Sequence, residues 1–325
     1  MQVLPLRFQH VRKLKKFFFA LLHATRVIHL VAWLNRNRVG ILCYHSVTGG
    51  NQPLPEDPHK LHLPLSLFLQ QLDYLQANFR IVSLSELLAA RREGRKLPSY
   101  SRVLTFDDGF RNFATVVAPQ LLSRKFAATS FLVTERSNHV NGANGFHGWS
   151  TKDDHSPLSW KEVTTLADKG LEFGSHTSSH PRLLNLSPAD ARREFEQSRT
   201  AIIEQIGKQK IPLSYPHGQT SAELSRLAES VGYSCGLTTA LGLNDENTDL
   251  FALRRIVIAS DDDLATFAAR VSGLTWWTGK LLRPLRATPA GVSEQSSYST
   301  PIAEELDILN RYEVSTESGS DRVSV

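Results

Sequence analysis

The chain has 325 residues, of which 41% are hydrophobic and 21% are charged, a balance typical of a globular protein with one large domain and additional segments. Two cysteines exclude a disulfide-rich scaffold. The formal net charge is +5, and the positive residues gather at the amino terminus, where eight Lys and Arg residues precede the first acidic residue, Glu56. Such a basic arm favours an anionic membrane surface or an acidic polymer as a partner. No recognisable motif supports nucleic-acid binding.

Residues 17–34 form an apolar segment behind this basic cluster. The segment is nearly long enough to span a bilayer, but Arg26 at its centre would be costly there. It also lacks a cleavage site of the Ala-x-Ala kind. Three interpretations remain: an interfacial helix, a helix packed on the main domain, or a signal anchor. We expect residues 1–39 to be a separate amino-terminal segment with peripheral membrane contact through residues 10–38. We favour a cytoplasmic or inner-membrane-associated protein over an exported one.

From Val39 onward, short apolar runs alternate with amphipathic helical patterns, which is typical of a parallel α/β sheet or barrel. The expected strands are residues 39–44, 79–83, 103–106, 128–133, 171–174, 211–215, 233–237 and 251–258. The expected helices are residues 64–78, 84–92, 113–125, 160–169, 188–207, 222–231 and 262–271. The polar stretch 135–159 is expected to be a long loop that forms a lid or a substrate rim.

The last segment, residues 273–325, differs from the rest. It begins with Trp276 and Trp277 among basic residues, so we expect a second surface contact with a membrane through residues 274–286. The sequence from residue 289 to the end is rich in Ser, Thr and Glu, which predicts a largely disordered acidic tail.

Chemically active side chains follow the expected strands directly. Parallel α/β folds place their sites at the carboxyl ends of strands, so these side chains are expected to meet. Two adjacent acids can reach one site only where the strand geometry breaks, and Gly109 supplies that break. Taken alone, the Asp-Asp-Gly sequence could equally be a solvated turn. The residues concerned are His45, Asp107, Asp108, His176 and His217.

A second pattern, His176-Thr177-Ser178-Ser179-His180, carries two histidines four residues apart. On a helical turn, such residues face the same way, so both imidazoles could bind one ion. Two histidines with one carboxylate leave open positions for water and substrate, and such sites bind zinc or another divalent transition metal.

The sequences TFDDG at 105–109 and SHTSSHP at 175–181 resemble the first two motifs of the NodB-type polysaccharide deacetylases, carbohydrate esterase family 4. The resemblance covers residues 40–272 and implies a distorted (β/α)7 barrel in that range. It also implies metal-dependent removal of acetyl groups from an N-acetylated polysaccharide, oligosaccharide or glycan-linked sugar. The early Tyr44-His45 pair is similar to the subgroup that includes the poly-N-acetylglucosamine deacetylases.

By this resemblance, Asp107 is the general base, and Asp108, His176 and His180 are the metal ligands. His45 is the acid that protonates the leaving amine. The chemistry agrees, because a metal polarises the acetyl carbonyl and acidifies water, and a nearby carboxylate removes the water proton. Zinc is favoured, with cobalt, nickel, manganese or iron as alternatives.

The third motif of the family, matched by residues 213–218, departs from the usual pattern. Many members have an arginine where this chain has Ser214, and a tyrosine where it has His217. The backbone N–H of His217 could still hold the oxyanion, and Tyr215 is the other candidate for contact with the substrate or the oxyanion. Arg255, or less readily Arg254, could replace the missing arginine that braces the base, although a structural arginine on a strand edge is the alternative. These departures leave a second hypothesis open, namely a catalytically weak or inactive carbohydrate-binding barrel.

Overall fold

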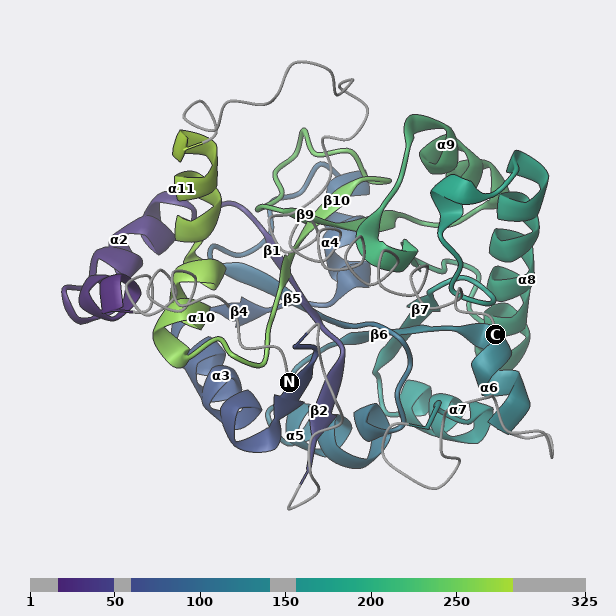
Figure 1. Ribbon diagram of the computed structural model, residues 1–325, viewed down its shortest axis with the longest axis horizontal. Coiled ribbons are helices and arrows are strands. Elements are labelled where there is room, and N and C mark those ends of the chain that lie inside the picture. The colour runs from purple at the N-terminus through teal and green to yellow at the C-terminus, as the bar shows by residue number, and fades with distance from the viewer. Residues whose placement is uncertain (1–16, 50–59, 141–155, 283–325) are drawn as a thin grey trace, which may run out of the picture.

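Seven parallel strands form a closed barrel in the computed structural model, which describes residues 17–49, 60–140 and 156–282 (Figure 1). The strand order is β1-β10-β9-β8-β7-β6-β5, and the pairing of β5 with β1 closes the ring. This arrangement confirms the predicted distorted (β/α)7 barrel. The strands are β1 (Gly40–Tyr44), β5 (Ser101–Phe106), β6 (Thr129–Leu132), β7 (Glu172–Ser175), β8 (Leu213–Ser214), β9 (Gly236–Leu241) and β10 (Leu253–Val257).

Three further strands lie outside this ring. The two-residue strand β4 (Arg80–Ile81) pairs with the start of β5. Strands β2 (Ser46–Thr48) and β3 (His62–Pro64) form a separate parallel pair. The sequence predicted a longer β4 and did not predict β2 or β3, because runs of two or three residues carry almost no periodic signal.

Helices cover the outside of the barrel and mostly begin at side-chain caps. Ser83, Ser159, Ser187, Ser221 and Asp263 each accept a hydrogen bond from a backbone N–H in the first turn of the helix that follows. The helices of the barrel are α3 (Leu65–Asn78), α4 (Leu84–Arg92), α5 (Ala118–Ser123) with a preceding π-helical turn (Phe113–Val117), α6 (Thr134–Val140), α7 (Trp160–Asp168), α8 (Pro188–Ile206), α9 (Ala222–Val231) and α10 (Leu264–Ser272). Short 3₁₀ turns lie at Leu183–Asn185 and Pro216–Gly218.

Two further predicted elements differ from the structure. Strand β9 covers Gly236–Leu241 rather than residues 233–237, and Tyr233, before the strand, has its hydroxyl hydrogen-bonded to Ser175 and Ser198 in the core. The start of the predicted loop 135–159 is helical, since α6 extends to Val140. Residues 141–155 of that loop lie outside the described residues, whereas Ser156 and Leu158, just before α7, are buried.

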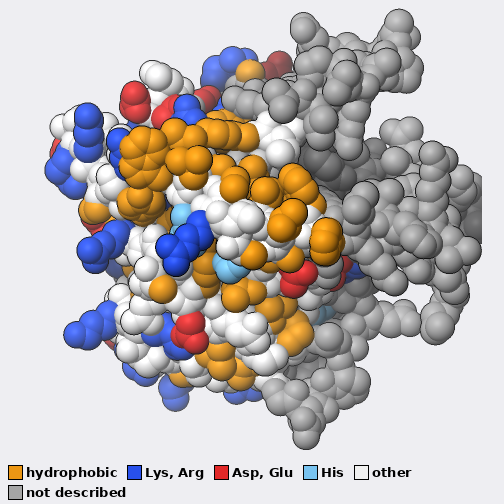
Figure 2. Space-filling model, turned by 90° about the vertical axis from the view of Figure 1, so that its left-hand side faces the viewer, with side chains coloured by type: hydrophobic (Ala, Val, Ile, Leu, Met, Phe, Trp, Pro, Cys, Tyr) orange, Lys and Arg blue, Asp and Glu red, His pale blue; other side chains and the backbone are white. Residues whose placement is uncertain are grey.

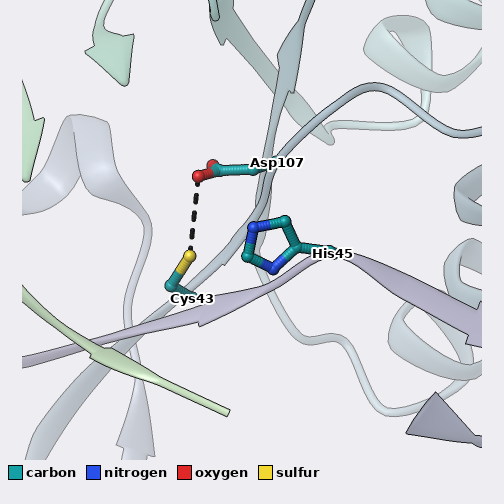
Figure 3. A group of neighbouring side chains, drawn as sticks. All are labelled: Cys43, His45 and Asp107. Atoms are coloured by element: carbon teal, nitrogen blue, oxygen red, sulfur yellow. Dashed lines mark hydrogen bonds between the residues drawn. The ribbon is translucent and has the colours of Figure 1, made fainter. Parts of the chain in front are cut away.

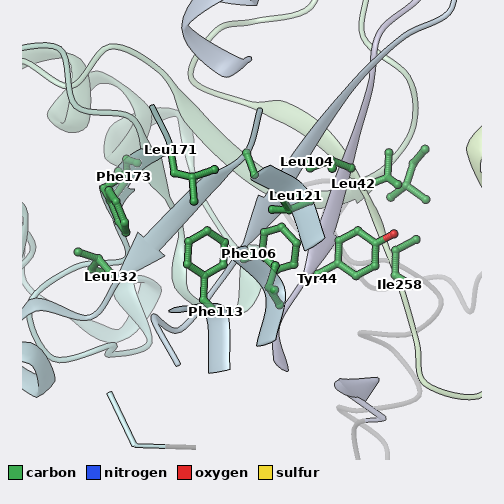
Figure 4. Close-up of a cluster of buried hydrophobic side chains, with 14 of the residues drawn as sticks. Leu42, Tyr44, Leu104, Phe106, Phe113, Leu121, Leu132, Leu171, Phe173 and Ile258 are labelled. Carbon is green, nitrogen blue, oxygen red and sulfur yellow. The ribbon is translucent and has the colours of Figure 1, made fainter. Parts of the chain in front are cut away.

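The core between the barrel and its helices is rich in aromatic side chains (Figure 4). The ring of Tyr44 stacks on that of Phe106 with centroids 5.2 Å apart, and Phe106 lies 5.2 Å from Phe113. The Tyr44 hydroxyl donates to Gln71 of α3. Because Tyr44 and Phe106 are the last residues of β1 and β5, their burial fixes where both strands end.

The amino-terminal segment packs on the outside of the barrel. The helix Phe17–Ala24 and helix α2 (Val27–Leu34) meet at an angle of 79°, with Arg26 in the left-handed region between them. Phe19, Ile28 and Val31 are buried in a cluster with residues of α10 and of α11 (Leu274–Leu282). Of the three interpretations of this segment, the structure supports a helix packed on the main domain.

The described residues contain no single helix that is both long and apolar enough to cross a bilayer, whereas the bent helix pair could do so by length and composition. In α11, Trp276 is buried and the guanidinium of Arg38 lies 5.1 Å from its ring, so this tryptophan is part of the packing. Residues 283–325 lie outside the described residues, and they include the predicted acidic tail, residues 289–325.

Candidate active site

The two acids at the end of β5 turn toward the same end of the barrel. Asp107 is tied to the neighbouring strand by its backbone N–H, which donates to the Tyr44 carbonyl at 2.9 Å. Asp108 and Gly109 both have positive φ angles, of 71° and 64°. The alternation of the strand breaks at Gly109, as the sequence predicted, and also at Asp108, which it did not predict, and both carboxylates so reach one place.

Asp107 forms a buried, two-point ion pair with Arg255 of β10. The guanidinium donates to Oδ1 at 2.8 Å and to Oδ2 at 2.7 Å, and both side chains are almost fully buried. Arg255 is held in turn by the Thr238 carbonyl, and the Ser214 hydroxyl bridges the pair. Burial would raise the pKa of Asp107, but Arg255, with His176, holds that pKa well below its usual range. Asp107 is therefore a carboxylate.

His45 lies next to this carboxylate at the end of β1 (Figure 3). Ligand atoms of Cys43, His45 and Asp107 all lie within 4.8 Å of one another, and the Cys43 thiol donates to Asp107 Oδ2 at 3.5 Å. Burial lowers the pKa of His45, while the carboxylates of Asp108 and Asp107 oppose that shift. In the described part of the chain, the buried Nδ1 of His45 has no hydrogen-bond partner. A substrate or water could supply one.

Asp108, His176 and His180 form the second group, with ligand atoms within 4.8 Å of one another. Nε2 of His176 and Nε2 of His180 lie 3.7 Å and 3.6 Å from Oδ1 of Asp108. Nδ1 of His176 lies 2.8 Å from the Ser214 carbonyl, which can only accept, so Nδ1 carries a proton and Nε2 is the ring atom that faces Asp108. Burial, with His176, lowers the pKa of His180 to about 3, so it is neutral.

This donor set fits a divalent transition metal. Its three ligand atoms converge to within 4.8 Å of one another, so a single ion could contact all of them. The pKa of Asp108, which burial would raise, is lowered by its neighbours His45, His176 and His180, so Asp108 is also ionised. Two imidazole nitrogens and one carboxylate oxygen are the ligands of many catalytic zinc sites.

The segment between the two histidines is not the helical turn that the sequence predicted. Thr177 and His180 have positive φ angles, of 66° and 64°, and the chain between them is irregular. Side-chain hydrogen bonds maintain this shape: the Ser175 hydroxyl accepts from Thr177 N–H, and the Thr177 hydroxyl accepts from His180 N–H. The two imidazoles still meet, with ring centroids 4.7 Å apart.

Glu194 of α8 supports the same loop and was missed by sequence reasoning. One carboxylate oxygen accepts from the backbone N–H groups of Ser178 and Ser179, both at 2.9 Å, and the other accepts from the Ser179 hydroxyl at 2.7 Å. No sequence motif marks Glu194, because an acid on a polar helix resembles any solvated residue. The contact depends on how α8 packs against β7.

The other predicted residues take different positions. The Tyr215 ring is buried in the core and its hydroxyl donates to the Phe251 carbonyl, so this side chain does not face the site. His217 is exposed in the left-handed region, with its ring 4.9 Å from that of His180. Arg254, the other candidate for the missing arginine, points away from Asp107, because neighbouring side chains on a strand face opposite sides.

Comparison with known proteins shows that the chain is similar to polysaccharide deacetylases. Residues 94–236 match the family model described as polysaccharide deacetylase. The chain is 24% identical over 247 residues to YxkH of Bacillus subtilis, a protein named as a polysaccharide deacetylase, covering 75% of this chain and 80% of that protein. It is also 24% identical over 204 residues to the poly-beta-1,6-N-acetyl-D-glucosamine N-deacetylase of Staphylococcus epidermidis, covering 60% of this chain and 67% of that protein.

Solved structures show the same fold. The deacetylase PplD of Streptococcus pyogenes, determined in complex with acetate, superimposes with a TM-score of 0.62 at 24% identity. The match covers 72% of this chain and 98% of that chain.

We expect Arg255→Met to lower the free energy of unfolding by about 3–5 kcal/mol at neutral pH, because it leaves a buried carboxylate unpaired. Arg254→Met on the same strand is the matched control and should cost less than about 1 kcal/mol. Urea unfolding measures both. If Arg255→Met lowered the free energy of unfolding no more than Arg254→Met does, the result would contradict a stabilising ion pair between Arg255 and Asp107.

The loss should also depend on pH. In the wild type, the pKa of Asp107 is lower in the folded state than in the unfolded state, where it is about 3.9. Asp107 therefore makes its full contribution to the free energy of unfolding at any pH above about 3.9. In Arg255→Met, burial without the guanidinium should raise that pKa above the unfolded value, so the variant loses stability as the pH rises. The deficit between variant and wild type should therefore be larger at pH 8 than at pH 5.

Glu194→Ala should weaken zinc affinity about 10- to 100-fold, because it removes the acceptor that holds the loop between the two histidines. Glu196→Ala, an exposed position on the same helix, should leave the affinity unchanged. Competition with a chromophoric chelator measures both constants. Equal affinities for the two variants would show that Glu194 does not position the ligands.

Proposed function

We propose that this chain, which contains a polysaccharide deacetylase domain, is an enzyme that hydrolyses N-acetyl groups on a polysaccharide or glycan-linked sugar. The observation that carries the proposal is the meeting of two groups at one end of the barrel. One is the carboxylate Asp107, held by Arg255 beside His45, and the other is the cluster of Asp108, His176 and His180. Together they supply a base, an acid and a metal site for amide hydrolysis.

Asp108, His176 and His180 would hold a divalent metal ion, with zinc favoured by two imidazoles and one carboxylate. When bound, such an ion polarises the amide carbonyl and lowers the pKa of water. The hydrogen bond from His176 to the Ser214 carbonyl fixes the ring and its tautomer, and Glu194 fixes the loop that carries His180.

Asp107 would accept the proton of the attacking water. Its ion pair with Arg255 keeps it ionised and oriented, but the same pair makes it a weak base. Such a weak base would need water whose pKa is lowered, as a metal ion held by Asp108, His176 and His180 would do. Arg255 would hold the carboxylate of Asp107 in place. In many NodB-type deacetylases, an arginine at the position of Ser214 has this role.

His45 would protonate the leaving nitrogen. Because burial lowers its pKa, the resting imidazole is neutral and becomes a donor only when it gains a proton during the reaction. Asp107, whose carboxylate lies within 4.8 Å, is positioned to return the proton it has taken from water. That proton then passes through His45 to the nitrogen as the C–N bond breaks, and the products are acetate and a free amine.

The backbone N–H of His217 would hold the developing oxyanion. His217 is in the left-handed region and its ring lies 4.9 Å from that of His180, and this proximity to the metal-ligand group supports the proposal. The Staphylococcus epidermidis relative acts on poly-beta-1,6-N-acetyl-D-glucosamine, so we propose a polymer of N-acetylglucosamine as the substrate class.

Asp107→Asn should lower kcat for acetate release from N-acetylglucosamine oligomers by about 10²- to 10⁴-fold, because the amide cannot take the water proton. Asp73→Asn, at an exposed carboxylate on α3, is the control and should retain the wild-type rate. Removal of metal with a chelator should abolish acetate release, and zinc or cobalt should restore it. Cobalt absorption in the visible range would show that Asp107→Asn still folds and binds metal.

Acetate release by Asp107→Asn at the wild-type rate would refute this mechanism. Binding of the oligomers without acetate release by the metal-loaded wild type would instead support the alternative of an inactive carbohydrate-binding barrel.

A further inference from the structure

The helix pair on the outside of the barrel, Phe17–Ala24 and α2, exposes large apolar side chains on its outer face. Six of them keep between 48% and 68% of their surface exposed to solvent. Figure 2 looks onto the side of the molecule that carries α2, and hydrophobic side chains gather there. We call this surface the outer patch; its members are Phe17, Phe18, Leu21, Leu30, Trp33 and Leu34.

The inner face of the same helix pair is also apolar. Phe19, Ile28 and Val31 are buried against Ala268, Ala269 and Leu274. A helix at the surface of a soluble domain normally turns one apolar stripe inward and a polar face outward. Here Leu30, Trp33 and Leu34 follow at spacings of three and four on the opposite side, so they form a second stripe that the barrel does not cover.

The helix pair and the sequence on either side of it carry charge of one sign. Residues 1–55 contain no acidic residue, and Arg26 and Arg36 lie within or beside the helix pair. The guanidinium of Arg36 lies 4.5 Å from the centroid of the Trp33 ring, which places a cation at the edge of the patch. Aromatic and aliphatic side chains flanked by arginine complement the interface of a bilayer that contains anionic lipids.

The helix pair is attached firmly to the barrel. Asn35, at the end of α2, is fully buried and donates through Nδ2 to the Ser272 carbonyl at 3.0 Å. The buried inner face adds apolar packing to this bond. Any surface that binds the outer patch would therefore hold the whole barrel in one orientation, rather than on a loose tether.

We propose that the outer patch docks the protein on the surface of an anionic lipid bilayer, with Leu30, Trp33 and their neighbours in the headgroup region and the inner face still packed on α10. This contact is independent of the reaction proposed above, because the helix pair contributes no residue to the catalytic groups.

Flotation of the full chain with lipid vesicles tests the proposal. The wild type should bind phosphatidylcholine vesicles that contain phosphatidylglycerol, and bind pure phosphatidylcholine less well. Leu30→Gln/Trp33→Gln should weaken the binding at least about tenfold, because it removes apolar area from the contact. Glutamine is a good helix former, so α2 should be kept. Leu184→Gln, at an equally exposed leucine on the turn Leu183–Asn185, is the matched control and should bind as the wild type does.

Arg36→Gln should reduce the preference for the anionic vesicles, and added salt should have the same effect on the wild type. Acetate release from a soluble oligomer should be the same for wild type and Leu30→Gln/Trp33→Gln, which shows that the variant is folded.

Three results would overturn the proposal. The wild type could fail to bind either vesicle, or Leu30→Gln/Trp33→Gln could bind as tightly as Leu184→Gln. Alternatively, the wild type could form a dimer that the double variant abolishes, without vesicle binding by either, and the outer patch would then join two copies of the chain.

Discussion

The parallel pairing of β1 with β5 is the constraint on which the rest of the structure depends. It closes the seven-stranded barrel, and its register sets Tyr44 opposite Phe106. One residue further along each strand, His45 and Asp107 therefore arrive at the same level of the barrel. The aromatic pair points outward into the helical core, so the following side chains point inward. A slip of one residue in this register would separate the proposed acid from the base.

Closure also brings β10 beside β1, which makes the ion pair of Asp107 and Arg255 possible across the inside of the barrel. A buried carboxylate needs a counter-charge. Ser214 occupies the position at which many NodB-type deacetylases have the arginine that supplies it. The small side chain at Ser214 leaves room for the guanidinium of Arg255 and bridges it to Asp107. Because buried ion pairs often add little net stability, the benefit here is the fixed orientation of an ionised Asp107.

The alternation of short strands and amphipathic helices predicted a parallel α/β sheet or barrel and most of its elements, because it leaves strong periodic patterns, and the resemblance to the NodB-type deacetylases implied the (β/α)7 barrel. The residue types in the sequence also identified Asp107, Asp108, His176 and His180 as a group. The sequence favoured Arg255 over Arg254 only weakly, since a shift of one residue along a strand moves each side chain to the opposite face. The helical turn predicted for His176 to His180 was wrong, because two left-handed residues and the contacts of Glu194 determine that loop. Such contacts depend on tertiary packing and leave no local signal.

Backbone strain is concentrated where the chemistry is expected. Among the described residues, eight non-glycine residues have positive φ angles, and Asp108, Thr177, His180 and His217 all lie at the site. Each costs about 1–3 kcal/mol, and a β-branched threonine in this region is especially unfavourable. The hydrogen bonds of Glu194 and Thr177 offset part of that cost. Strained residues of this kind persist only where the surrounding contacts hold them, so the packing and hydrogen bonds of this chain determine the shape of the ligand cluster, and a preorganised cluster lowers the reorganisation that a reaction requires.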